Sequence, residues 1–143
     1  MNTSQSIKKN ASFVNKFLRK ELKGEPKQLY DAASHLIIHG GKRLRPYLVL
    51  KSCQILGGKQ SDAIAAASSV EMIHNFTLVH DDIMDQDSIR HGKVTVHEKW
   101  DDGIAILTGD AMLSLGLKLI NKIIPKLQTN NNRNSRFIYL TIC

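Results

Sequence analysis

The sequence predicts an all-α protein, an antiparallel helix bundle with short loops. Three observations support this prediction. Apolar residues recur at helical spacing through most of the 143 residues. The chain has only 3 prolines, which leaves room for long uninterrupted helices. No stretch sustains the alternation of apolar and polar residues that is typical of a β-strand, and short glycine- or proline-containing segments separate the helices.

The first two helices are expected at residues 6–22 and 27–38. Apolar residues fall on one face of each, and in the first helix they are Ile7, Ala11, Val14, Phe17, Leu18 and Leu22. Gly24 and Pro26 stop the first helix. The glycine pair at 40–41 ends the second helix and opens a loop.

The third helix is expected to begin at Arg45–Pro46, because proline is favoured in a first turn, and to run to about Leu56. A glycine pair then breaks it. Ser61 is the expected N-cap of the fourth helix, which is rich in alanine and extends to about Asp85. At 1.5 Å per residue this helix is about 35 Å long.

Residues 86–102 are expected to form a polar connection with one short helix near His97. Asp102 is the expected cap of the last long helix, residues 103–124, which carries an apolar stripe. Pro125 ends or kinks that helix.

The chain is expected to divide into a helical domain of residues 1–127 and a polar tail of residues 128–143. The tail begins with QTNNNRNSR, which has no apolar face, and we predict that it is loop or disordered.

The formal charge of +7 suits an anionic partner. No nucleic-acid-binding motif is present, so nucleic acid is not expected. The polar start MNTSQSIKKN is unlike a signal peptide, and charged residues within 104–124 make a poor membrane span. Cys53 and Cys143 are too few for a disulfide framework. A reducing compartment, the cytoplasm, is therefore the expected location.

Four aspartates, Asp81, Asp82, Asp85 and Asp87, lie within seven positions. On a helix, Asp81 and Asp85 project side by side, which suits a hard cation such as Mg²⁺. Asp82 points about 100° around the helix and is interpreted as a supporting carboxylate. The alternative is a solvated acidic helix end, although the helix dipole disfavours carboxylates there.

His74 lies seven residues before Asp81 and falls on the same helical stripe, about 10 Å further back. The alternative is an ordinary core or surface histidine. Upstream, the segment GGKRLRP offers Lys42 as a point charge and Arg45 as a fork for phosphate oxygens. Taken alone, this segment is interpreted as a solvated basic loop. Together with the aspartates, it indicates a site that binds both a phosphate group and a metal ion.

Six elements occur in a specific order: GGKRLRP, EMIH, LVHDDIMDQD, Arg90, Gly92 with TVH, and ILTGDAML. Over roughly residues 35 to 120 this set resembles the trans-prenyl diphosphate synthases, the family of farnesyl and geranylgeranyl diphosphate synthases. The resemblance implies an isoprenoid synthase-like bundle, incomplete here because only the amino-terminal half is present. It also implies a Mg²⁺-dependent condensation of isopentenyl diphosphate with an allylic diphosphate, and a homodimer for full-length members.

The resemblance assigns roles to individual residues. Asp81 and Asp85 resemble the magnesium ligands of the first aspartate-rich motif, and Arg90 resembles the arginine that holds the allylic diphosphate. The positions that resemble the isopentenyl diphosphate site are Lys42, Arg45, His74 and His91.

Two further positions bear on specificity. His91 stands where the family usually has a second arginine, so we predict weaker diphosphate binding. Phe76 lies five residues before the aspartate motif, where family members limit product length, and with no insertion in DDIMD the product resembles the geranylgeranyl type. The alternative for Phe76 is a core aromatic.

Two other functions stay open. One is a metal phosphohydrolase of the HD type, based on His80–Asp81 with His35, His39 and His97 as further ligands. The other is a non-catalytic helical subunit or interaction module derived from a synthase. The family's second aspartate-rich motif has no counterpart after Asp110, and the tail of residues 128–143 is unlike the family's continuation. We therefore expect a fragment that binds magnesium diphosphate weakly rather than one that turns over substrate.

Overall fold

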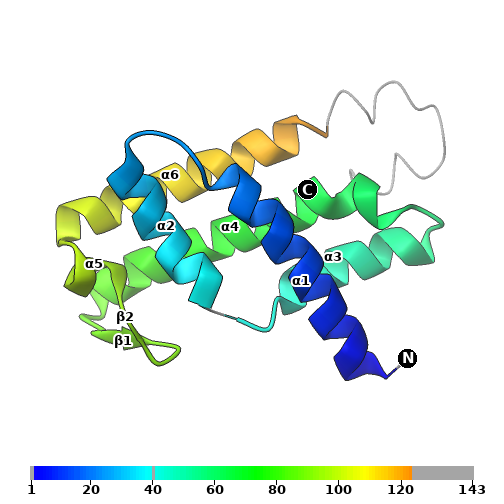
Figure 1. The fold of residues 1–143 in the computed structure, drawn as a ribbon, viewed down its shortest axis with the longest axis horizontal. Helices are drawn as coiled ribbons and strands as arrows, with labels where there is room; N and C mark the ends of the chain where they lie inside the picture. Colours follow the sequence, from blue (N-terminus) through cyan, green and yellow to red (C-terminus); the bar gives the residue numbers. More distant parts are fainter. Residues whose placement is uncertain (1, 40, 124–143) are drawn as a thin grey trace.

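A computed structural model describes residues 2–39 and 41–123 of the chain. The prediction of an all-α fold is confirmed. The elements, in order, are α1 Thr3–Glu21, α2 Lys27–His39, α3 Leu44–Ile55, α4 Gln60–Met84, β1 Ile89–Arg90, β2 Lys93–Val94, α5 Val96–Lys99 and α6 Asp102–Asn121. Figure 1 shows α4 and α6 side by side along the long axis, with α1 and α2 crossing them and the small hairpin at one end.

α4 is the central helix of the bundle and packs most extensively against α6 and α3. Met72 and Val79 of α4 and Met112 of α6 are almost completely buried. Two glycines of α6 allow the close approach. A Cβ at Gly109 would lie 2.3 Å from Nε2 of His80, and one at Gly116 would lie 2.9 Å from the Ile73 side chain.

α6 is long and apolar enough to cross a membrane by length and composition, with a mean hydropathy of 1.5. The sequence expectation of a poor span depended on charges that include Lys122, and the helix ends before that residue, at Asn121. In this fold the buried side of α6 is core, and the carbonyl of Gly116 accepts a hydrogen bond of 2.7 Å from the Ser69 hydroxyl of α4.

The start of α4 differs from the prediction of Ser61 as N-cap. The helix begins at Gln60 and its N-cap is Lys59. The Asp62 carboxylate accepts a 3.0 Å hydrogen bond from the backbone N–H of Lys59 and so stabilises the first turn. Asp62 therefore stabilises the start of α4 from within the first turn. The sequence had predicted that the Ser61 hydroxyl would do so as the N-cap.

The start of α6 also differs, by one residue. Asp101 rather than Asp102 is the N-cap, and its Oδ1 accepts a 2.7 Å hydrogen bond from the backbone N–H of Ile104. Adjacent aspartates are equally good caps by residue type, and the backbone geometry selects one of them.

The connection at residues 86–102 contains the expected short helix near His97, which is α5. It also contains a β-hairpin that the sequence did not predict. Ile89 pairs with Val94 and Arg90 with Lys93. His91 and Gly92 form the turn with φ angles of 52° and 74°, the positive values that two-residue hairpin turns require. The predictions for Pro125 and for residues 128–143 lie outside the described residues.

Candidate functional site

The carboxyl end of α4 presents Asp81 and Asp85 on successive turns. The backbone N–H of Asp85 donates to the Asp81 carbonyl at 2.8 Å, which places both residues on one face. Both residues are exposed, and neither forms an ion pair with any side chain that the structure describes. The two carboxylates are thus available to a cation.

The chemistry of these donors fits magnesium. Within residues 2–39 and 41–123, no group of three or more His, Cys, Asp or Glu is placed to hold a metal ion. Magnesium commonly takes one or two carboxylates and completes its shell with water and substrate phosphate. A pair of exposed carboxylates, rather than a closed cage, is the arrangement that this coordination needs.

Asp82 points about 100° around the helix from Asp81 and ties α4 to the hairpin. Its side chain is 1% exposed, and its Oδ1 accepts a hydrogen bond from Nε of Arg90. Nη2 of Arg90 also donates to Asp87 at 3.1 Å. Burial raises the pKa of the Asp82 carboxyl, although the hydrogen bond and positive charge of Arg90 oppose that rise. The hydrogen bond that Arg90 donates to Asp82, together with the charges of Asp82, Asp87 and Asp81, raises the pKa of Arg90.

Arg90 therefore sits beside the aspartate pair with its orientation fixed from one side. Its side chain keeps 23% of its exposure, so part of the guanidinium still faces solvent. An arginine held in this way is pre-oriented for a bound anion. The Oδ1 atom of Asp82 is committed to Arg90, and the role of Asp82 as a supporting carboxylate stays a prediction.

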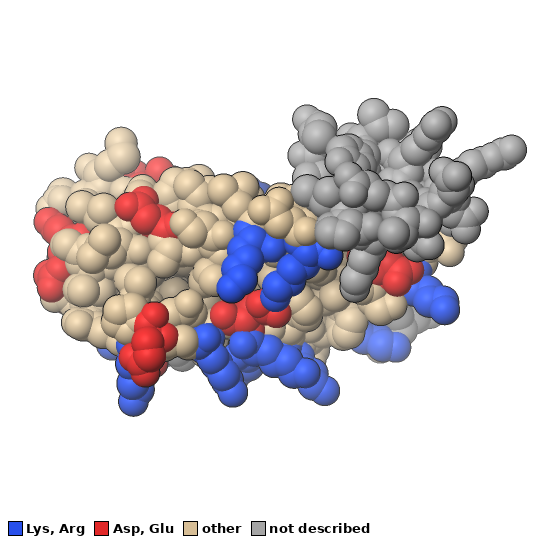
Figure 2. Space-filling view, turned by 90° about the horizontal axis from the view of Figure 1, so that it is seen from above, with Lys and Arg blue, Asp and Glu red and all other residues tan. Residues whose placement is uncertain are grey.

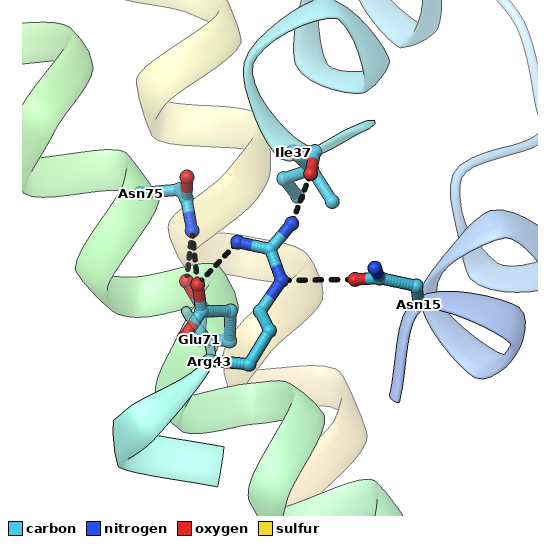
Figure 3. A network of polar contacts seen from close by, with 5 residues as sticks. All are labelled: Asn15, Ile37, Arg43, Glu71 and Asn75. Atoms are coloured by element: carbon cyan, nitrogen blue, oxygen red, sulfur yellow. Dashed lines mark hydrogen bonds and ion pairs between the residues drawn. The ribbon is translucent and has the colours of Figure 1, made fainter. Parts of the chain in front are cut away.

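Arg43 is the anchor of the loop that joins α2 to α3, and the sequence analysis did not single it out. It is 3% exposed and adopts a left-handed backbone conformation, with φ of 55°. Figure 3 shows its guanidinium reaching three helices. It donates to Glu71 on α4 at 2.7 Å, to Asn15 on α1 at 2.9 Å and to the Ile37 carbonyl on α2.

The neighbours of Arg43 complete this network. The Asn75 amide donates to the Glu71 carbonyl at 2.7 Å and to its carboxylate at 3.3 Å. Gly41 adopts φ of 80°, and a Cβ there would lie 3.0 Å from the Arg43 guanidinium. Because Arg43 points inward, Lys42 and Arg45 on either side of it stay exposed. Neither of them pairs with a carboxylate in the described part of the chain.

His74 connects this loop to the hairpin. It is half-buried on α4, two turns before Asp81. Burial lowers the pKa of His74 most, and the positive charge of Arg45 lowers it further. Arg43 and His91 add to this effect, while Glu71 opposes it. Arg45, His74 and His91 therefore share one electrostatic neighbourhood, on the side of α4 where Figure 1 shows the α2–α3 loop and the hairpin.

The family model for polyprenyl synthetases matches residues 26–140. The chain belongs to the polyprenyl synthetase family. The match covers more than half of the chain and confirms the resemblance drawn from the motifs. It also extends into the segment 128–143, which the sequence analysis had set apart from the family.

Curated relatives that the chain is similar to include geranylgeranyl diphosphate synthases. The synthase of Saccharolobus solfataricus is 41% identical over 128 residues, which are 90% of this chain and 39% of that protein. The enzyme of Geoglobus acetivorans is 45% identical over 119 residues, which are 82% of this chain and 37% of that protein. The chain thus spans about two-fifths of the length of these polyprenyl synthetases.

Solved polyprenyl synthetase structures share the fold. The geranylgeranyl pyrophosphate synthetase from Pyrococcus horikoshii superposes with a TM-score of 0.79 at 41% identity, covering 82% of this chain and 36% of that one. A decaprenyl diphosphate synthase from Rhodobacter capsulatus has a TM-score of 0.75 at 32% identity, covering 83% and 37%. Because these two names describe products of different length, the fold of this half does not set product length by itself.

Phe76 lies five residues before Asp81 on α4, about 140° around the helix from it. Its ring packs edge-on against His80, with 4.8 Å between the ring centroids. His80 in turn contacts α6, with Nε2 3.3 Å from the Ile106 carbonyl. Phe76 is partly buried against the core, which fits the alternative that it is a core aromatic. Its role in limiting product chain length remains a prediction.

The remaining histidines do not gather around His80–Asp81. His35 contacts the hairpin through the Val94 carbonyl at 2.8 Å. Both ring nitrogens of His97 are buried and make no hydrogen bond with the described residues, and its charge acts on Asp82. The side chain of His39 is outside the described set. This arrangement gives the HD-type phosphohydrolase no support.

Proposed function

We propose that this chain is the amino-terminal, diphosphate-binding part of a prenyl diphosphate synthase of the geranylgeranyl type. One observation carries the proposal. Asp81 and Asp85 are exposed carboxylates at the end of α4, and Lys42 and Arg45 are exposed cations in the α2–α3 connection and the first turn of α3. Among the described residues, none of these four side chains forms an ion pair. The names of the similar relatives support the geranylgeranyl product.

The proposed reaction joins two substrates. The allylic C–O bond breaks, and the electron pair leaves with the diphosphate. The double bond of isopentenyl diphosphate attacks the allylic carbocation, a proton is lost and the chain is five carbons longer. Magnesium, when bound, supplies charge neutralisation for the leaving diphosphate.

The residues of this chain divide the binding work. Asp81 and Asp85 would hold the Mg²⁺, and Arg90, oriented by Asp82, would donate to the allylic diphosphate. Lys42, Arg45, His74 and His91 would bind isopentenyl diphosphate. The separation of acidic and basic groups along α4 suits two diphosphates, one of which arrives with its metal.

Because the chain spans 39% of a relative's length, the rest of the cavity would come from polypeptide outside these residues. Turnover by the isolated chain is therefore not expected, and a homodimer and a cytoplasmic location remain proposals. A second candidate is a non-catalytic subunit. For this candidate the chain would assemble with a second subunit, and one relative from Arabidopsis thaliana, 44% identical, is named as the large subunit of a heterodimeric geranylgeranyl pyrophosphate synthase.

The test is calorimetric binding of magnesium diphosphate to the full chain. The double variant Asp81→Asn/Asp85→Asn should bind at least about tenfold more weakly, because removing two carboxylates removes the metal's protein ligands. The control is Asp102→Asn. Asp102 is exposed and lies at the start of α6, away from the aspartate pair in sequence. Equal affinity in all three proteins would end the proposal. Labelled isopentenyl diphosphate with each allylic diphosphate then measures turnover.

A further inference from the structure

A groove of about 1020 Å³ lies between α1 and α2, apart from the aspartate cluster and the α2–α3 loop cations. Its floor includes the half-buried Asn15 and Ser34, which offer amide and hydroxyl groups, and the exposed Ser12 lies among the cations. Four cations line it along α1, and a fifth follows the end of that helix: Lys8, Lys16, Arg19, Lys20 and Lys23. We refer to this feature as the α1–α2 groove.

The cations of the α1–α2 groove are not neutralised by the described part of the molecule. None of the five forms an ion pair there, and Asp31 is the only carboxylate in the lining. Glu21, the only carboxylate of α1, is paired with Lys122 at 2.8 Å. The view from above shows Lys and Arg side chains gathered near the middle of the molecule around few acidic groups (Figure 2).

The length of the cationic row identifies the size of its partner. From Lys8 to Lys20 the helix rises about 18 Å at 1.5 Å per residue, and Lys23 follows just after the helix ends. A single diphosphate is too short to contact the whole row. An extended polypeptide, at about 3.3 Å per residue, covers this helical part with about five or six residues.

We propose that the α1–α2 groove binds an acidic polypeptide segment from outside this chain's residues 1–143. Charge complementarity favours carboxylates along the row. The serine hydroxyls and the Asn15 amide nitrogen, which makes no hydrogen bond with described residues, suit the backbone and carboxylates of a peptide. Residues 124–143 of the chain contain no Asp or Glu, so they cannot supply the segment.

Other polyanions fit the α1–α2 groove less well. No aromatic residue lines it, so single-stranded nucleic acid would find no surface for base stacking. A bilayer surface is flat and would contact the protruding lysines but not the polar floor. A peptide can contact both the row of cations and the polar side chains of the floor.

The test uses an octaglutamate peptide and the full chain at low salt, with affinity measured by fluorescence anisotropy. Wild-type chain should bind, and Lys16→Glu/Lys20→Glu should weaken binding about tenfold or more. The charge-matched control is Lys9→Glu/Lys27→Glu, both exposed and outside the groove, which should bind within about twofold of wild type. An equal loss in both double variants would show general charge attraction and overturn the proposal.

Two further measurements keep the result independent of variant folding. Amide shifts of wild-type chain on titration with the peptide should concentrate on α1 and α2; shifts centred on the hairpin would overturn the proposal. Vesicles with 30% phosphatidylserine and a ten-nucleotide oligouridine are the competing probes. Tighter binding of either than of the peptide would assign the groove to a different partner and reject this one.

Discussion

Arg43 and Glu71, 28 residues apart in sequence, form an ion pair of 2.7 Å with side chains only 2% and 5% exposed. Removing one partner of such a pair leaves the other charge buried without compensation. Glu71→Ala should therefore lower the free energy of unfolding by about 3–5 kcal/mol. Urea denaturation measures this change. Lys42→Ala, at an exposed neighbouring position, should change it by less than about 0.5 kcal/mol, and a similar loss in both variants would contradict the structural role of Arg43.

The bond between Asp82 and Arg90 is expected to hold the hairpin against α4. Asp82→Asn removes the charge that orients Arg90, so the hairpin should open more often. Hydrogen exchange of the Thr95 amide, which donates to the Ser88 carbonyl at 3.1 Å, should become about tenfold faster. Asp87→Asn is the matched control, because Asp87 is half exposed and its bond to Arg90 is the weaker of the two. Unchanged exchange in Asp82→Asn would show that the hairpin does not depend on Arg90.

His74 is a reporter for the basic side of the site. Burial and Arg45 lower its pKa from the usual 6.5, so folding is favoured while the imidazole is neutral. This contribution to stability is present above pH 6.5 and is lost as the pH falls through the lowered pKa. Inorganic diphosphate bound near Arg45 would add negative charge and raise the pKa of His74. An NMR titration of its ring protons, with and without diphosphate, measures both shifts; no movement with saturating ligand would remove His74 from the site.

His91 occupies the hairpin turn, and the resemblance places an arginine there. Histidine is shorter than arginine and carries less positive charge at neutral pH. His91→Arg should tighten binding of isopentenyl diphosphate several-fold at pH 7.5, by about 1 kcal/mol, the size of one exposed charge-assisted contact. For the native chain, affinity should improve as the pH is lowered. Lys93→Arg introduces a guanidinium in the same hairpin without changing its charge, so it controls for the guanidinium itself and should leave the affinity unchanged. Equal affinities of native and His91→Arg chains would refute the assignment.

Much of the fold could be predicted from the sequence because the signals are local. Helical periodicity located all five long helices, and the glycine and proline positions located their ends to within a few residues. The hairpin was missed because strands of two residues carry no periodic pattern. The N-cap at Asp101 was missed because the adjacent aspartates are equally suitable by type. The N-cap at Lys59 was missed because Asp62 stabilises that first turn from inside the helix.

The site divides in the same way. The spacing of Asp81 and Asp85 on α4 follows from helical geometry alone. The inward turn of Arg43 does not, because three cations in GGKRLRP look alike in sequence and the choice among them depends on Glu71, far along the chain. The positive φ of Arg43 gives no signal either, since arginine is not a residue that typically adopts it. The available hint in the sequence was Glu71 followed four residues later by Asn75 in the middle of a long helix. This polar pair indicates that α4 holds a cationic side chain, which proved to be Arg43.

The attachment of Arg43 to α1, α2 and α4 has a consequence for the order in which the protein folds. Its loop cannot reach its final shape until all three helices have met, because each supplies one hydrogen-bond acceptor. Pieces of such a chain that begin after α1 would retain every motif residue yet present Lys42 and Arg45 on an unformed turn. The turn that presents Lys42 and Arg45 is in this sense a late product of assembly, completed when the first helix docks.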